Sequence, residues 1–303
     1  MHKLSRRQLT LLVLLTLVWG INWPIMKLGV TGYPPLTFRT ICMWLGLPVL
    51  ALVLLWRRVP FRIARAHWRE LALLAVFNMF FWHTLAILAI QSLSSGRAAI
   101  LGYTMPVFSA MIGALWFSQR LGLRAWGGVA AAALGVVLLL WHEVGVLSSR
   151  PTGVLMMLVA ASTWALGTQL MRRTRIDAPT LAISFWMTLL TTLWMSLLSV
   201  LFERDAWTVP SPPVWGAIVY NALGVFAFAQ VVWLMLARDL PPIASTLSVM
   251  MIPVLGVFSG AWWLGEVLHW QDWAAVMLVM TAIAMVLWPP RSAAARVAAP
   301  RGG

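Results

Sequence analysis

The sequence is poor in charge, and above all in negative charge. Only 10% of its 303 residues are charged, and 8 of these are acidic against 22 Lys and Arg residues, whereas an average soluble domain carries about 25% charged residues. Hydrophobic residues make up 61% of the chain, and its apolar runs reach the roughly 20 residues that cross a bilayer. We therefore interpret the chain as an integral membrane protein.

The sequence also lacks the groups on which most enzyme and metal sites depend. It contains no Gly-x-Ser-x-Gly motif, no closely spaced His or Cys cluster and no glycine-rich phosphate loop. The acidic residues fall in loops or at span ends, and the single Cys42 allows no intramolecular disulfide. We predict that the protein is not an enzyme and has no metal and no cofactor. A membrane enzyme or a lipid-handling protein stays open as an alternative.

Apolar runs bounded by charged residues, Pro or Gly predict ten membrane helices joined by short loops. They are expected at about residues 9–28, 36–56, 71–91, 96–117, 125–142, 152–171, 179–201, 213–236, 242–264 and 270–288. Such short loops leave no room for a separate soluble domain, so the function is expected inside the helix bundle.

The basic residues indicate topology. They lie in short clusters between the spans instead of on one polar face, which argues against a nucleic-acid partner. With ten spans, 17 of the 22 Lys and Arg residues fall on the side that holds both termini. By the positive-inside rule we expect a multi-pass protein of a bacterial inner membrane with both termini in the cytoplasm.

Residues 91–141 and 238–288 are two copies of one pattern. They align without a gap at a constant offset of 147, which places Pro106 on Pro253 and Trp116 on Trp263. Ten spans then divide into two fives, and an odd number per half turns the copies in opposite directions. We predict an all-α integral membrane protein with ten transmembrane helices in two inverted-topology five-helix repeats. Their expected bounds are 1–146 and 147–290, followed by a disordered cytoplasmic tail at 291–303.

Inverted repeats are typical of secondary transporters, whose substrate sites lie near the midplane between the halves. Polar and aromatic side chains gather at this depth, and a buried indole NH needs an acceptor that lipid cannot supply. The alternative is that each polar group only ties two helices together and each Trp only packs. The predicted substrate-binding residues are Trp19, Asn22, Asn78, Trp82, His83, Trp164, Gln169, Asn221 and Gln230.

Three further features bear on mechanism. His83 is the one titratable residue in mid-span, either as a substrate contact or proton-responsive gate or as a neutral imidazole bonded to a neighbouring helix. Pro106 and Pro253 lie near the centres of their spans and are predicted hinge or gate positions. Lys27, Arg39 and Arg97 at span ends are most simply snorkelling cations, with contact to a substrate carboxylate as the alternative.

The ten-span plan and the segment Leu264-Gly265-Glu266-Val267-Leu268, followed by Gln271 and Trp273, resemble the drug/metabolite transporter superfamily with paired EamA domains. The resemblance covers about residues 9–288, and Gln119 stands where the first repeat would carry the equivalent glutamate. The many tryptophans and the segment Trp19-Gly20-Ile21-Asn22-Trp23-Pro24 are similar to bacterial aromatic amino acid exporters of the YddG type.

Together these observations predict a secondary transporter that exports amino acids, aromatic and other, or similar small metabolites across the inner membrane by alternating access. Because no carboxylate is expected at mid-span, the protein is predicted to be a facilitator. A proton-coupled drug/metabolite antiporter is the alternative. The expected partners are the small-molecule substrate and the lipid bilayer. The oligomeric state is left open, with a monomer favoured.

Overall fold

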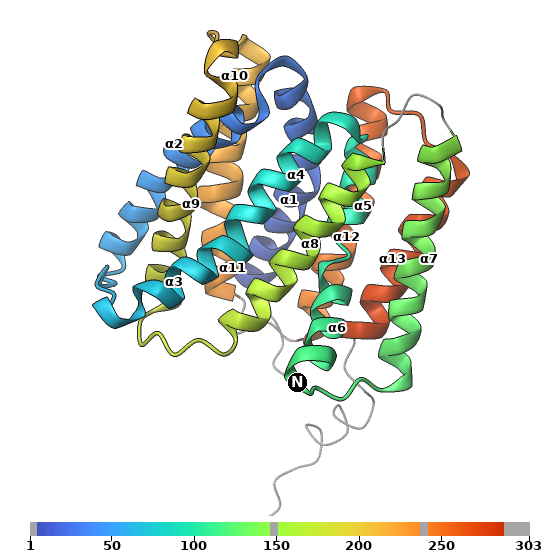
Figure 1. Cartoon of the computed structure of the whole chain (residues 1–303), viewed down its shortest axis with the longest axis horizontal. Coiled ribbons are helices and arrows are strands. Elements are labelled where there is room, and N and C mark those ends of the chain that lie inside the picture. Colours follow the sequence, from blue (N-terminus) through green and yellow to red (C-terminus); the bar gives the residue numbers. More distant parts are fainter. Residues whose placement is uncertain (1–4, 146–150, 237–241, 288–303) are drawn as a thin grey trace, which may run out of the picture.

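The structure, a computed structural model, describes residues 5–145, 151–236 and 242–287, and in these ranges every regular element is helical (Figure 1). This confirms the predicted ten-helix membrane fold, while the tail predicted at 291–303 lies outside the described residues. The ten segments are α1 (Arg6–Gly32); α2 (Pro35–Trp56); η1 (Arg65–His67), α3 (Trp68–Ala75), η2 (Val76–Phe80) and α4 (Phe81–Ser92) in series; α5 (Ser95–Gly102) with α6 (Met105–Phe117); α7 (Leu123–Gly145); α8 (Thr152–Met171); α9 (Thr180–Glu203) with η3 (Arg204–Ala206); α10 (Pro212–Val219), η4 (Tyr220–Ala229) and α11 (Gln230–Leu236) in series; α12 (Pro242–Leu264); and α13 (Trp270–Leu287).

Eight of the described segments are long and apolar enough to cross a membrane, and the described parts of α7 and α12 are shorter apolar helices. Helix α1 begins at the end of the bundle drawn at the bottom of Figure 1, which we call the lower end. The turn from α1 to α2 and the start of α10 lie at the opposite, upper end.

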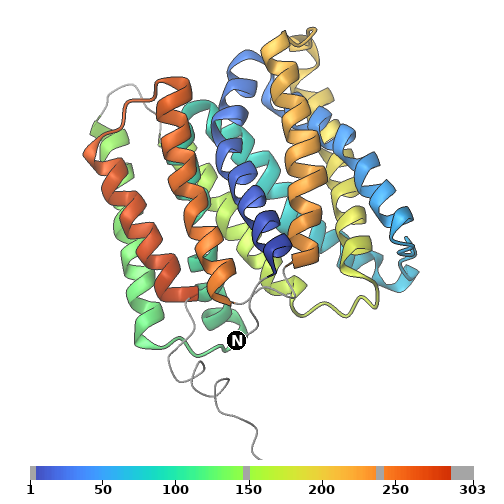
Figure 2. The ribbon, with the colours of Figure 1, turned by 180° about the vertical axis from the view of Figure 1, so that it is seen from behind.

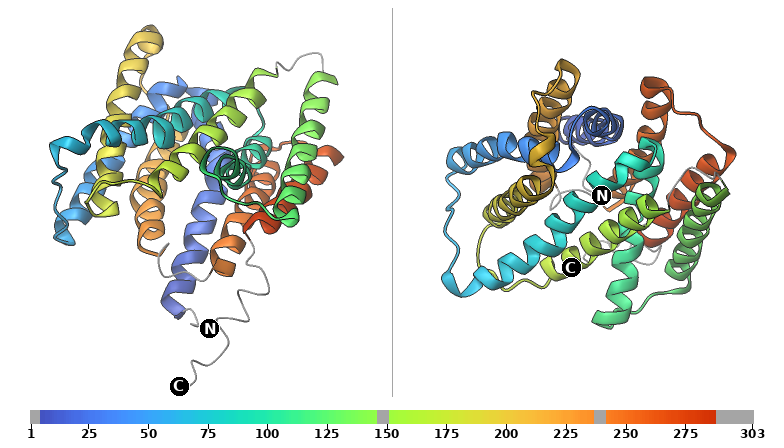
Figure 3. Two further views of the ribbon diagram at one scale, coloured as in Figure 1. Left: turned by 60° about the horizontal axis from the view of Figure 1, so that its bottom comes forward. Right: turned by 45° about the horizontal axis from the view of Figure 1, so that its top comes forward.

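Corresponding helices of the two halves pack against one another. Helix α7 contacts α13, α5 contacts α12, and α2 contacts α9. In Figure 3 the pair α7 and α13 lies at one edge of the bundle and the pair α2 and α9 at the other. Seen from behind, α1 runs beside α12 near the centre (Figure 2). The centre is therefore formed by helices from both halves.

The duplication is visible in the backbone. Ser118 ends α6 in the left-handed conformation with φ 54°, and Gly265, which lies 147 residues later, follows α12 with φ 66°. The amide of Gln119 then donates to the carbonyl of Gly113 at 3.0 Å, and that of Glu266 donates to Gly260 at 3.4 Å. A left-handed residue after the last turn is a common way to end a helix. The same helix stop is thus built twice.

The two copies differ at their prolines. Span 4 breaks at Tyr103 and Thr104 and resumes as α6 with Pro106 in its first turn, whereas α12 continues through Pro253. Proline suits a first turn because its missing N–H would have no helical partner there. The Thr104 hydroxyl donates to the Leu101 carbonyl at 2.6 Å, which satisfies an acceptor at the break.

Spans 3 and 8 contain π-helical segments that the sequence analysis did not predict. Segment η2 carries Asn78 and η4 carries Asn221, each directly after an aromatic residue, Phe77 or Tyr220. A π-helical turn is wider than an α-helical turn, and such turns are frequent at functional sites. Both lie on helices that the sequence assigns to the midplane site.

The contact of α8 with η2 provides a stability test. A Cβ atom added to Gly167 would lie 2.5 Å from the backbone N and Cα atoms of Asn78, whereas one added to Gly216 on α10 meets no atom within 4 Å. We expect Gly167→Ala to destabilise the protein by about 1–3 kcal/mol, because backbone atoms must shift. Gly216→Ala should be neutral or slightly stabilising, since Ala favours helix. Thermal unfolding of the two variants in detergent is the measurement, and equal Tm values would contradict the close approach.

Candidate functional site

Three carboxylates are used to satisfy backbone amides at the ends of neighbouring segments. At the upper end Glu203 accepts from the amides of Leu36 and Thr37, at 3.0 and 2.7 Å. Glu266 accepts from Ser95 N at 2.6 Å and Gly96 N at 3.2 Å. These amides belong to the first turns of α2 and α5. The first amides of a helix have no partners within that helix, and they carry partial positive charge. At the lower end Glu70 accepts from the Thr174 hydroxyl and the Arg175 amide, at 2.7 and 2.9 Å.

The expectation that three cations snorkel at span ends is wrong for Arg39 and Arg97. Arg97 Nε donates to Asp272 Oδ1 at 2.7 Å, and both side chains are largely buried. Arg39 is only 4% exposed and lies between helices. Lys27 Nζ donates to the carbonyls of Ile90 and Gln91, at 3.0 and 2.8 Å, near the end of α4. Packing among neighbouring helices, which sequence does not show, determines these positions.

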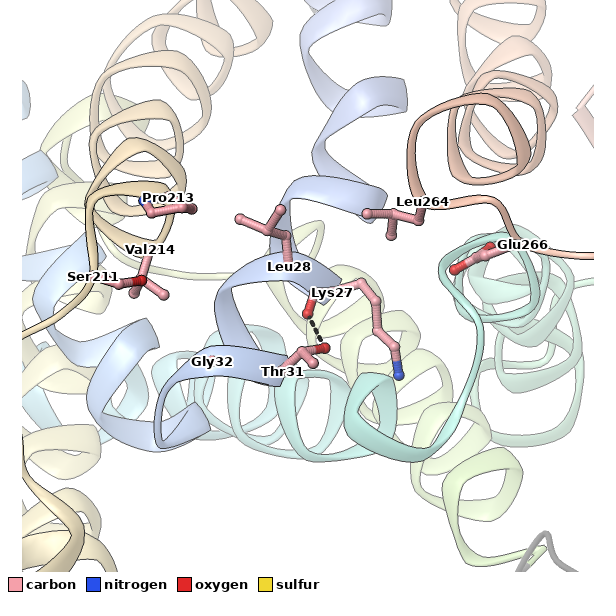
Figure 4. A pocket seen from close by; sticks show the side chains of 9 residues that line it. All are labelled: Lys27, Leu28, Thr31, Gly32, Ser211, Pro213, Val214, Leu264 and Glu266. Atoms are coloured by element: carbon pink, nitrogen blue, oxygen red, sulfur yellow. Dashed lines mark hydrogen bonds between the residues drawn. The ribbon is translucent and has the colours of Figure 1, made fainter.

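A pocket of about 450 Å³ opens at the upper end. Its lining comes from the last turns of α1, the start of α10 and the end of α12 (Figure 4). Lys27 and Glu266 lie on one side of it, and Ser211 and Val214 lie on the other. The residues that line it are Lys27, Leu28, Thr31, Gly32, Ser211, Pro213, Val214, Leu264 and Glu266.

Below Glu266 the helices of spans 4 and 9 are in close contact. A Cβ atom on Gly96 would lie 3.2 Å from Val257 Cα, and one on Gly256 would lie 2.6 Å from Ala99 Cβ. Beyond the break, α6 packs against α8, where Gln169 Nε2 donates to the Ser109 carbonyl at 2.7 Å. Spans 4 and 9 therefore meet at the upper end, and the lower half of span 4 leans onto span 6.

Several predicted midplane residues join helices. The Asn78 amide donates to the Trp164 carbonyl and to the Thr168 hydroxyl, both at 3.3 Å, and so ties η2 to α8. Gln169 also accepts from Arg173 at 2.7 Å. These contacts give Asn78 and Gln169 structural partners, and they place both side chains on the central helix α8 or against it.

The predicted tryptophans lie in two places. Trp19 contacts Trp233, with ring centroids 5.7 Å apart, on the side of α1 that faces α11. Trp82 and Trp23 both lie against Gly102, next to the break in span 4. Trp23 also packs against Tyr103, with ring centroids 6.3 Å apart. Gln230 begins α11 and is half-buried. The predicted residues therefore do not form one compact group.

The polar residues Arg39, Asn221 and His83 lie around Phe226 of η4. Arg39 Cζ lies 5.6 Å from the centroid of this ring, and the His83 ring lies 5.4 Å from it. Arg39 Nη1 donates to Asn221 Oδ1 at 3.3 Å. Arg39 Nε and His83 Nδ1 are buried and, among the described residues, have no hydrogen-bond partner; the same is true of Asn22 Oδ1 on α1. The structure thus brings His83 and Asn221 together around Phe226 and Arg39, neither of which is among the predicted substrate-binding residues.

Phe226 was missed because it is an ordinary apolar residue. Arg39 was assigned to a span end, with contact to a substrate carboxylate only as the alternative. A signal was present for Arg39. It lies four residues after Pro35, inside an apolar run, with no acidic residue nearby in the sequence, and ionisable groups inside spans are functional by default.

The available chemistry is binding. No group of His, Cys, Asp or Glu in the described parts of the chain could hold a metal ion. Glu70, Glu203, Glu266 and Asp272 are held at helix ends by hydrogen bonds. Around Phe226 and α8 the described residues instead present amides, indoles, the His83 imidazole and the Arg39 guanidinium.

Comparisons with known proteins agree on the family. The model of the EamA-like transporter family matches residues 7–141 and 151–288. The chain is 27% identical to the uncharacterized inner membrane transporter YedA of Escherichia coli K12, over 90% of this chain and 88% of that protein. It is 25% identical to a probable amino-acid metabolite efflux pump of Salmonella typhimurium, over 92% and 94%.

A crystal structure matches the fold with a TM-score of 0.64 at 20% identity, covering 95% of this chain and 99% of the other. The two matched regions together span both predicted halves. The chain belongs to the EamA-like transporter family and is a multi-pass membrane transporter.

Proposed function

We propose that this transporter exports amino acids, aromatic ones among them, or similar small metabolites across a bacterial inner membrane by alternating access. The observation that carries the proposal is a central region of amide, indole and guanidinium groups, in which the nearby carboxylates are committed to helix ends. A zwitterion can use such neutral and cationic groups, since indole faces attract ammonium groups by about 0.5–2 kcal/mol. The relative that is named an amino-acid metabolite efflux pump supports the same substrate class.

The lower end, where α1 begins, is proposed to face the cytoplasm, because most basic residues fall on that side. In this orientation the contact of spans 4 and 9 closes the side away from the cytoplasm. Glu266 holds that contact through the first turn of α5. In the first repeat the equivalent position is Gln119, so the two gates are alike in backbone form and different in charge.

We further propose that the protein is a facilitator. Proton-coupled carriers use a titratable group inside the membrane, and His83 is the candidate for that role in the alternative mechanism, a proton-coupled antiporter. His83 packs on Phe226, with ring centroids 5.4 Å apart. No described carboxylate is paired with His83. Our proposal assigns it a packing and substrate-lining role.

Counterflow tests the function. Purified protein in liposomes loaded with unlabelled phenylalanine should take up labelled phenylalanine, tryptophan and leucine without an imposed proton gradient. The flux arises because alternating access exchanges substrate across the membrane down its own gradient. Empty liposomes are the control, and the absence of amino acid flux with correctly folded protein would refute the proposal.

His83→Gln tests the coupling. The variant should keep phenylalanine counterflow close to the wild-type rate, because an amide can replace a neutral imidazole as a polar lining group. An imposed pH gradient should drive no accumulation in either protein. If the wild type accumulates substrate with the pH gradient and His83→Gln does not, the antiporter is the correct mechanism.

Glu266→Gln tests the gate and the orientation. Val257 is 1% exposed beneath the contact, so a Val257→Cys thiol in a Cys42→Ala background should react slowly with a membrane-impermeant maleimide outside intact cells. Adding Glu266→Gln should raise the labelling rate several-fold, because a neutral amide accepts more weakly from the α5 amides. Adding Asp205→Asn, a change at an exposed site, is the matched control. Equal rates with and without Glu266→Gln would reject this gate.

A further inference from the structure

Arg39 is a buried charge whose hydrogen-bond donors are only partly satisfied by the protein. Its side chain is 4% exposed and lies among α1, α2 and η4. Nη1 donates to Asn221 Oδ1 at 3.3 Å, Nη2 contacts Met26 Sδ at 2.6 Å, and Nε has no hydrogen-bond partner among the residues that the structure describes. A thioether is a weak acceptor. The guanidinium edge formed by Nε and Nη2 therefore lacks an oxygen acceptor.

Such a charge is costly without an anion. Burying an unpaired ion in a low-dielectric interior is strongly unfavourable, and buried charges are normally paired. Within the described ranges, no carboxylate is within ion-pair distance of Arg39. The rings of Phe226 and His83, which lie nearby, cannot supply a negative charge. The described residues therefore offer Arg39 no anion, and a bound ligand can supply one.

We propose that Arg39 binds the carboxylate of the transported substrate through its Nε and Nη2 edge. Two parallel N–H groups match the two oxygens of a carboxylate, and this bidentate pairing is stronger and more selective than contact with a point charge. The inference rests on the proposed function, because it assigns one group of the proposed amino acid substrate to one residue. It defines the substrate class as carboxylates, so amines and amides of the same shape are excluded.

Phe226 packs beside this site. The centroid of its ring lies 5.6 Å from Arg39 Cζ and 5.4 Å from the centroid of the His83 ring, and the residue belongs to η4, the π-helical segment that also carries Asn221. A Cβ atom on Gly46 would lie 2.6 Å from Phe226 Cβ, so α2 and η4 touch here. Asn221 and Phe226, which both lie beside Arg39, belong to this one π-helical segment, so a change in its turn would move both together.

Ligand-induced stabilisation tests the inference separately from transport. The Tm of the purified protein is measured with 3-phenylpropionate, 3-phenylpropanamide, phenethylamine and L-phenylalanine. The wild type should be stabilised by the two carboxylates and not by the amide or the amine. Arg39→Gln should weaken carboxylate binding by about tenfold or more, equivalent to about 1.4 kcal/mol, and Arg39→Lys should retain part of it. Arg204→Gln, which removes an exposed charge at the same end, should behave as wild type.

The outcomes separate the two proposals. If phenylalanine counterflow occurs and Arg39→Gln leaves its half-saturation concentration unchanged, the proposed function stands and the role of Arg39 is rejected. If 3-phenylpropionate binds through Arg39 and no amino acid is transported, the carboxylate site stands and the amino acid function is rejected. Equal stabilisation by 3-phenylpropanamide, or by chloride at the same concentration, rejects the carboxylate site. Should Arg39→Gln fail to fold, the acid and amide comparison on the wild type decides.

Discussion

The constraint on which this structure depends is that hydrocarbon offers polar groups no partners, so the protein must supply them. Glu203 and Glu266 satisfy the first amides of α2 and α5, and Asp272 neutralises Arg97. Each contact joins segments distant in sequence. These acidic residues are therefore tied to helix ends. Arg39 is left without an anion among the described residues, and this is the physical reason to regard it as functional.

The two halves show how one sequence pattern yields two helix ends that are not equivalent. Ser118 and Gly265 produce the same helix stop, and the following amides return to Gly113 and Gly260. Only the second copy then presents a carboxylate, Glu266, to a helix start. Pro106 begins a new helix, whereas Pro253 lies inside a continuous one. The two copies thus share their local backbone form. They differ in the charge at the helix end and in the continuity of the proline-containing helix.

The π-helical segments carry residues of the proposed binding site. Segment η2 holds Asn78 against α8, and η4 holds Asn221 and Phe226 against Arg39. In both, a wide turn coincides with the asparagine that contacts another helix. Such turns are frequent at functional sites, which agrees with the position of Asn221 and Phe226 beside Arg39.

The sequence by itself determined the ten helices, their approximate ends, the duplication and the family, because apolar length, helix-breaking residues and repeated motifs are local properties of the chain. It also identified Asn78, His83 and Asn221 as central. Only the tertiary structure decided that Asn78 and Gln169 are bonded across helices, that Arg97 is paired with Asp272, and that Arg39 is buried beside Phe226. Partners of a side chain depend on helix rotation and contact across distant segments, and hydrophobicity that is nearly uniform around each helix does not encode that rotation.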